Sequence, residues 1–209
     1  MKIICITGCV GTGKTTVSNL LRKRGYPVLD IDGCAKELIK LKHIDEKICS
    51  EYNTSTKNFK HLIFTNENCR KRLKIILYPR IFIKISYEVI KLIFKGHGLI
   101  FLDIPLFFEL KLNYFFDSLV VYCNRTNQIT RIEKRDGKRY KNEKLDIQWD
   151  IETKIKMASI VIDNNESLEK TEKQLDNLKF NKISIYFYIF FFLSLYFINL
   201  PSHPEINKI

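Results

Sequence analysis

A glycine-rich segment near the N-terminus has the residues of a phosphate-binding loop. Residues 8–15, GCVGTGKT, match the pattern G-x-x-x-x-G-K-T, directly after an apolar run. Glycines at these spacings let successive backbone N–H groups turn toward one anion, and the start of a following helix adds partial positive charge. We expect Lys14 to neutralise β- and γ-phosphate oxygens and Thr15 to offer its hydroxyl to Mg²⁺. The nucleotide-binding residues predicted on this basis are Gly8, Cys9, Val10, Gly11, Thr12, Gly13, Lys14, Thr15 and Thr16.

A carboxylate for the same metal ion is expected from Asp103, which follows the apolar residues 99–102. An apolar strand ending in Asp is the usual source of the second magnesium ligand beside a phosphate-binding loop. Asp is also favoured at helix caps, so a purely structural role for Asp103 remains open. The predicted metal ligands are Thr15 and Asp103.

Two further acids, Asp30 and Asp32, follow the second short apolar run. Phosphoryl transfer to a hydroxyl benefits from a carboxylate that orients the hydroxyl and accepts its proton. One of the two is expected to do so, although their spacing alone does not say which. A turn or a helix cap is the alternative, because Asp is common at both.

A basic cluster surrounds the Asp-Gly pair at residues 136–137. It lies between a predicted helix and a polar stretch, where a small lid at about residues 136–146 could close over the phosphates. Guanidinium groups stabilise the charge that accumulates during phosphoryl transfer, and closure excludes water. We place Arg135 in both the catalytic and the nucleotide-binding sets, and a solvated basic face is the alternative. The cluster comprises Arg131, Lys134, Arg135, Lys138 and Arg139.

The elements that must position these residues follow an α/β pattern, in which short β-branched or aromatic runs alternate with longer amphipathic stretches. The predicted strands are residues 3–7, 27–30, 99–104, 118–123 and 159–162. The predicted helices are residues 14–24, 33–42, 67–78, 81–95, 125–135, 144–157 and 168–178. Residues 42–95 carry no strand signal, so we expect a helical insertion there that sets substrate specificity. A single domain over residues 1–180 accommodates all of these elements.

The charge composition favours anionic partners but does not identify one. Of the 209 residues, 35 are Lys or Arg and 23 are Asp or Glu, giving a formal charge of +12 that favours polyanions. Drift toward Lys-rich composition is an equal explanation of this charge. The six cysteines are scattered without metal-site spacing and are expected to be reduced. The N-terminus has no secretory signal pattern, so we expect a cytoplasmic protein.

The C-terminal tail is apolar. Residues 183–200 carry no charge, and as a helix of about 1.5 Å per residue they would nearly match a bilayer core. Lysines at positions 179 and 182 precede them, which suits a membrane anchor on a cytoplasmic domain. A last helix packed on the domain, or an interface between copies, is the alternative.

Five ordered stretches resemble the dephospho-coenzyme A kinase family over about residues 1–178. ITGCVGTGKTTV at 6–17 resembles the family's T-G-G-I-G-S-G-K-S-T-V, and VLDID with AKEL at 28–38 resembles V-I-D-A-D…A-R-E-L. LKIILYPRI at 73–81 is similar to L-E…L-H-P-x-I, DIPLFFE at 103–109 to D-V-P-L-L-F-E, and ASIVIDN at 158–164 to A-D-x-V-I-D-N. Lys36, Tyr78 and Lys154 differ from the family pattern, which has Arg, His and Arg there, and Lys lacks the bidentate fork of Arg.

The resemblance implies a P-loop kinase fold built on a five-stranded parallel sheet. It also implies the phosphorylation of the ribose 3′-hydroxyl of dephospho-coenzyme A with ATP and Mg²⁺, the last step of coenzyme A biosynthesis. The second acid of the matched motif is the family's proposed base, so Asp32 joins Lys14 and Arg135 as a catalytic residue. The acceptor-binding residues implied in the same way are Asp32, Lys36, Tyr78, Pro105, Leu106 and Glu109.

Two alternatives stay open beside this interpretation. One is another small-molecule or nucleoside monophosphate kinase, and the other is a catalytically weak, membrane-tethered nucleotide-binding protein. A guanine-reading N-K-x-D motif does not occur in the sequence, which disfavours a GTPase. We expect a monomer that binds no nucleic acid, because the basic charge is not accompanied by a nucleic-acid-binding fingerprint.

Overall fold

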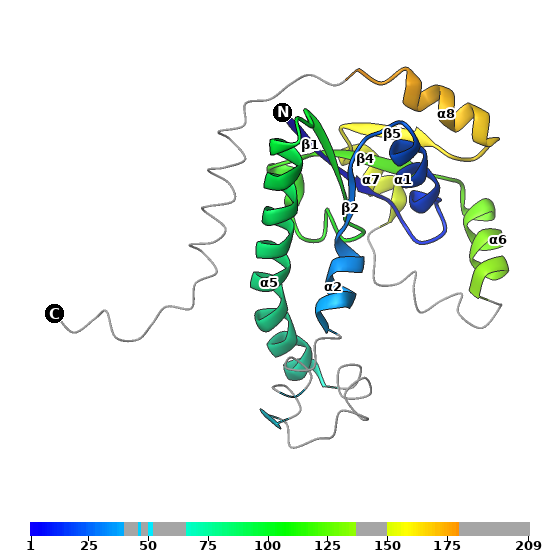
Figure 1. The fold of residues 1–209 in the computed structure, drawn as a ribbon. Coiled ribbons are helices and arrows are strands. Elements are labelled where there is room, and N and C mark those ends of the chain that lie inside the picture. The colour runs from blue at the N-terminus through cyan, green and yellow to red at the C-terminus, as the bar shows by residue number, and fades with distance from the viewer. Residues whose placement is uncertain (40–45, 47–49, 52–65, 137–149, 180–209) are drawn as a thin grey trace. The chain divides into compact units, whose positions relative to one another are not determined.

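The computed structural model describes residues 1–39, 46, 50–51, 66–136 and 150–179. The described chain forms two compact units, the first comprising Met1–Asp32 with the segment from Val89 onward and the second lying within Gly33–Glu88. Helices α2 (Ile31–Ile39) and α5 (Glu67–Phe94), both labelled in Figure 1, each have residues in both units.

The first unit is built on a five-stranded sheet in the order β2-β3-β1-β4-β5, and every neighbouring pair is parallel. This confirms the predicted α/β class and the five predicted strands to within two residues at each end. Nearly continuous apolar sequence is what a strand covered on both faces requires, and the inner strands are buried accordingly. The strands are β1 (Lys2–Thr7), β2 (Val28–Asp30), β3 (Leu99–Asp103), β4 (Asp117–Tyr122) and β5 (Ile160–Asp163).

The core of this unit forms where helix α1 (Lys14–Lys23) and helix α8 (Leu168–Asp176) pack on each other and on the sheet. Ile4 and Ile6 of β1 belong to the cluster, together with Leu21 of α1 and Leu175 of α8. Side chains alternate between the faces of a strand, so the equally buried Ile3 and Cys5 point to the opposite face. The sheet is therefore covered on both sides.

Parallel pairing brings the carboxyl ends of the strands to one edge of the sheet. Asp103 at the end of β3 is in register with Asp30 of β2 and with Ile6 of β1, and Thr7 is in register with Val120 of β4. Ligands of open parallel sheets bind outside such an edge. The predicted phosphate loop and the predicted acids therefore emerge at the same edge.

Helix α5 corrects the predicted break at Pro79. Two helices were expected, 67–78 and 81–95, because Pro removes a backbone donor and its ring disturbs the preceding turn. The structure instead has one continuous helix, Glu67–Phe94. Nη1 of Arg80 donates to the Ile76 carbonyl at 2.8 Å, one residue after the carbonyl of Ile75 that loses its backbone partner to Pro79.

The other helices agree with the predicted ones except at their boundaries. Helix α2 begins at Ile31 rather than at Gly33, which places Asp32 in its first turn. Helix α7 (Ile151–Met157) begins where the Asp150 carboxylate accepts from the Thr153 amide at 3.3 Å. The remaining helical elements are α6 (Arg125–Asp136) and a 3-10 turn, η2 (Leu112–Tyr114).

Several parts of the predicted architecture fall outside the described residues. These are the lid beyond Asp136, most of residues 42–65 of the predicted insertion, and the apolar tail at residues 183–200. Within the part of the chain that is described, no helix combines the length and apolarity needed to cross a bilayer.

Candidate active site

The loop between β1 and α1 depends on glycine at positions where no other residue fits. Gly8 and Gly13 have φ angles of 146° and 97°, in the range that L-residues rarely adopt. A Cβ atom on Gly13 would lie 2.0 Å from Nδ2 of Asn164, and one on Gly8 would lie 2.5 Å from the Val121 carbonyl oxygen. The fingerprint glycines thus allow close approach of the loop to the ends of β4 and β5.

The carbonyl groups of the loop are held by side chains from other elements. Nε2 of Gln128 donates to the Val10 carbonyl at 2.7 Å, and Nδ2 of Asn164 donates to the Thr12 carbonyl at 2.9 Å. Nη1 of Arg131 donates to the same Thr12 carbonyl at 3.3 Å. Gln128 and Asn164 are almost fully buried, so these bonds are made away from solvent. They occupy acceptors that would repel an anion, and they fix the loop at both ends.

Lys14 starts α1 and folds back over the loop, where its ammonium donates to the Gly8 carbonyl at 3.0 Å. Burial lowers the pKa of Lys14, whereas the nearby Asp103 carboxylate raises it. The Lys14 ammonium therefore places a positive charge near the first turn of α1, where the helix dipole is also positive. Thr15 and Thr16 follow in that turn and are exposed.

Asp103, at the end of β3, interacts with side chains of α1 beside the loop. Asp103 accepts a hydrogen bond from the buried Ser18 hydroxyl at 3.0 Å. Burial raises the pKa of Asp103, while the Ser18 hydrogen bond and the Lys14 charge lower it and the charges of Asp30 and Asp32 raise it. Asp103 is thus bonded to α1 through Ser18, and its pKa responds to Lys14 and to both candidate bases.

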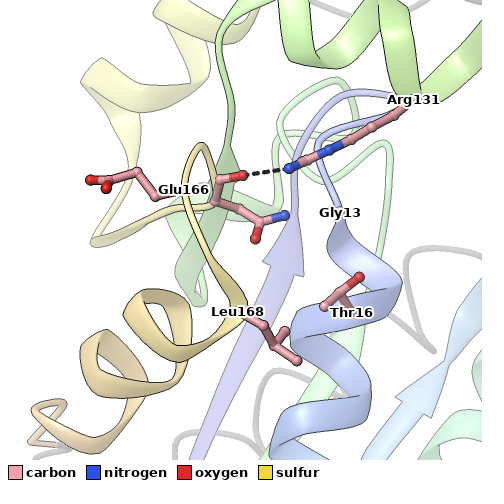
Figure 2. Close-up of a pocket in the computed structure, with 6 residues that line it drawn as sticks. Gly13, Thr16, Arg131, Glu166 and Leu168 are labelled. Carbon is pink, nitrogen blue, oxygen red and sulfur yellow. Dashed lines mark hydrogen bonds between the residues drawn. The ribbon is translucent and has the colours of Figure 1, made fainter.

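A pocket of about 230 Å³ opens beside Gly13 (Figure 2). Arg131 reaches over the loop from α6, and its Nη2 donates to the Asn164 carbonyl at 2.8 Å, the bond drawn dashed in Figure 2. The Asn164 side chain is fixed in turn by the Thr171 hydroxyl, which donates to it at 3.0 Å. Residues from α1, α6 and the β5–α8 connection thus share one hollow next to the phosphate loop. The lining residues are Gly13, Thr16, Arg131, Asn164, Glu166 and Leu168.

Sequence reasoning missed the residues of this pocket that follow β5. It selected Arg135 from the basic cluster, yet the structure brings Arg131 to the loop, while the Arg135 side chain is exposed at the end of α6. Asn164 was quoted within the ASIVIDN stretch but received no role. The position of that stretch could have indicated a role for Asn164. Asn164 follows β5, whose carboxyl end lies at the same edge of the sheet as that of β1.

The residues expected to bind the acceptor are distributed over both units. In the first unit, the Pro105 carbonyl accepts from the Thr7 hydroxyl at 3.1 Å, Leu106 is partly exposed, and Glu109 forms an ion pair with Lys154 at 2.9 Å. In the second unit, Lys36 is exposed on α2, and Tyr78 is exposed on α5.

The sequence is similar to known kinases over most of its length. The family described as dephospho-CoA kinase matches residues 2–170. The dephospho-CoA kinase of Oceanobacillus iheyensis is 34% identical over 189 residues, covering 84% of this chain and 95% of that protein. The Oryza sativa dephospho-CoA kinase is 30% identical over 191 residues, covering 85% of this chain and 83% of that protein.

Two solved structures share the fold. TT1252 from Thermus thermophilus superposes with a TM-score of 0.73 at 30% identity, covering 84% of this chain and 94% of that one. The dephospho-CoA kinase from Campylobacter jejuni superposes with a TM-score of 0.62 at 25% identity, covering 83% of this chain and 94% of that one. Sequence and fold agree, and the chain belongs to the dephospho-CoA kinase family.

Proposed function

We propose that this protein transfers the γ-phosphoryl group of ATP to the ribose 3′-hydroxyl of dephospho-coenzyme A. The observation that supports this most directly is a phosphate loop with Lys14 folded over it, in a chain whose residues 2–170 match the dephospho-CoA kinase family. The acceptor oxygen forms a bond to the γ-phosphorus as the bond to the β-phosphate bridging oxygen breaks. The products are ADP and coenzyme A, which carries the new 3′-phosphate.

The phosphates are bound by the loop and by Lys14. Backbone N–H groups of the loop and the start of α1 donate to the anion, and the Lys14 ammonium balances the charge on the β- and γ-oxygens. The nucleoside occupies the pocket beside Gly13, which continues from the start of α1 and is lined by polar groups. Arg131 forms one wall of that pocket. Arg135, one turn further along α6, stays a predicted partner of the phosphates.

Asp32 orients the acceptor hydroxyl and takes its proton. It lies in the first turn of α2 and is exposed, so a bulky substrate can reach it. Its negative charge is among the causes that raise the pKa of Lys14, which supports a position near the phosphate site. Lys36 and Tyr78 contribute to acceptor binding from α2 and α5.

The donor set near the loop fits a magnesium ion. Asp103 supplies a carboxylate whose Oδ2 already accepts from Ser18, and Thr15 supplies an exposed hydroxyl. Mg²⁺ in such sites needs only one or two protein oxygens, because water and phosphate complete its shell. When bound, it neutralises charge on the β- and γ-phosphates. Among the described residues there is no cluster of three or more His, Cys, Asp or Glu of the kind that a protein-only metal cage requires.

The test is ADP release by the full chain with ATP, Mg²⁺ and dephospho-coenzyme A, compared with a nucleoside, a nucleoside monophosphate and a sugar acid as acceptors. We expect the highest kcat/KM with dephospho-coenzyme A, and mass spectrometry should find one added phosphate on its ribose. Preferred turnover of a nucleoside monophosphate would support the alternative kinase. ATP binding without turnover on any acceptor would support the catalytically weak protein.

A further inference from the structure

A lysine without solvent contact lies beneath the phosphate site. Lys154 of α7 has a relative exposure of 0%, and its ammonium is 2.9 Å from Oε1 of Glu109, whose side chain is 15% exposed. Burying a charge is costly unless a partner compensates it. Removing one partner of such a pair leaves an uncompensated buried charge, so the contacts around it matter.

The pair lies where two functional segments meet. Glu109 ends the stretch 103–109 that starts with the metal-ligand candidate Asp103. The Lys154 ammonium also lies 3.5 Å from the Pro105 carbonyl oxygen, and that oxygen accepts from the Thr7 hydroxyl at 3.1 Å. Thr7 is the last residue of β1 and directly precedes the phosphate loop. One carbonyl therefore connects α7, the segment after Asp103, and the start of the loop.

The electrostatics agree with this placement. Burial is the main cause that lowers the pKa of Lys14, and the charge of Lys154 lowers it further. Burial raises the pKa of the Cys9 thiol, Lys154 counteracts this, and Glu109 adds to it. Both members of the pair thus act on the electrostatics of the phosphate loop.

We propose that Lys154 and Glu109 are positioning residues, a buried ion pair that holds the Pro105 carbonyl, and through it Thr7 and the 103–109 segment, in register with the phosphate loop. This inference rests on the proposed function. It assigns Glu109 to the support of the nucleotide site rather than to direct contact with the acceptor. A lateral error of about 1 Å in such a site can cost about 10²-fold in rate, so the support carries weight.

Two uncharged double variants test whether the hydrogen bonds of the pair, and not its charges, hold the 103–109 segment in position. Lys154→Met with Glu109→Leu replaces the pair by apolar side chains of similar length, a change that buried ion pairs often tolerate without loss of stability. Lys154→Gln with Glu109→Gln is equally uncharged but keeps a donor toward the Pro105 carbonyl and an acceptor at position 109. The two variants differ in hydrogen bonding and not in charge.

The full chain carrying each double change is compared with the wild type by calorimetric melting, by ATP affinity without acceptor, and by kcat and KM. We expect the Met/Leu variant to melt near the wild-type temperature, yet to lose about 10- to 10²-fold in ATP affinity and kcat combined. The Gln/Gln variant should recover most of that loss. Wild-type ATP affinity and kcat in a folded Met/Leu variant would overturn the proposal.

A single change, Glu109→Gln, keeps the proposal testable if the double variants do not fold. It leaves Lys154 a hydrogen-bond partner, and we expect weaker ATP binding and lower kcat. A higher KM for dephospho-coenzyme A alone would overturn the proposal in favour of direct acceptor contact. ATP affinity is measured without acceptor, so it tests the positioning role independently of the acceptor. Failure of the proposed function would instead appear as the wild type preferring another acceptor.

Discussion

The phosphate loop of the first unit and the paired helices of the second unit are held in different ways. The loop is fixed by short hydrogen bonds from almost fully buried side chains, including Gln128 and Asn164. In the second unit, α2 and α5 are joined by the ion pair of Lys84 with Glu37, whose carboxylate side chain is 69% exposed. Tyr78 of α5 is exposed as well.

This difference has consequences for mutation. Removing one partner of a buried hydrogen bond leaves the other polar group unsatisfied and costs about 1–3 kcal/mol. An exposed ion pair is screened by water and contributes about 0–1 kcal/mol. We therefore expect single substitutions around the loop to have large effects on nucleotide binding and rate. Single substitutions in the second unit should have small ones.

The largest effect is expected from Lys14→Ala. It deletes the charge opposite the β- and γ-phosphates, and kcat/KM should fall about 10³-fold, at the upper end for loss of one electrostatic stabiliser. Lys23→Ala is the matched control, because Lys23 is an exposed lysine in the last turn of the same helix. Steady-state ADP release measures both variants. Near-normal turnover in Lys14→Ala would contradict the assignment of the phosphate site.

The next largest effect is expected from Asp32→Asn. Loss of the proton acceptor should lower kcat about 10²-fold while ATP affinity stays close to the wild type. Asp30→Asn is the control, since Asp30 acts on the same Asp103 carboxyl but precedes α2. Single-turnover kinetics measure the rate of phosphoryl transfer, and calorimetric titration measures ATP affinity. A larger loss in the Asp30 variant would transfer the role of base to that residue.

A smaller effect, dominated by structure, is expected from Gly13→Ala. Gly13 and Gly25 both have positive φ, 97° and 81°, so Ala at either position should cost about 1–2 kcal/mol in backbone strain. A Cβ on Gly13 would also meet Asn164 at 2.0 Å, whereas one on Gly25 would meet nothing within 4 Å. We expect only the Gly13 variant to lose ATP affinity, measured beside thermal melting. Equal behaviour of the two would mean that the close approach to Asn164 is unimportant.

Prediction of the fold from sequence succeeded where structure depends on neighbouring residues. The strand, loop and helix around residues 2–23 follow from an apolar run, a glycine pattern and a helix start that lie within one short stretch. The place of Asp103 at the end of β3 was predicted because that strand carries its own apolar signal. The sheet follows from the same alternation, since parallel strands need helical crossovers between them.

Prediction was weaker where a role depends on a distant partner. Arg131 and Arg135 lie one turn apart on the same helix, and only the fold shows that Arg131 reaches the Thr12 carbonyl. Nothing local marks Lys154 and Glu109, which are far apart in the sequence, as a buried pair. The continuity of α5 through Pro79 was also missed, because the local effect of a proline predicts a break.

The smallest effect is expected from Lys84→Met, which removes the ion pair with Glu37 in the second unit. The pair is partly exposed and screened by salt, so we expect at most about 1 kcal/mol of lost stability and unchanged ATP affinity. Glu37→Gln should give the same small change, and the double variant should be no worse than either, because all three lack one interaction. Unfolding in urea gives the change in the free energy of unfolding, and steady-state kinetics give the KM for dephospho-coenzyme A. A loss of several kcal/mol, or a large rise in that KM, would show that this ion pair organises the second unit and that the contrast with the loop is wrong.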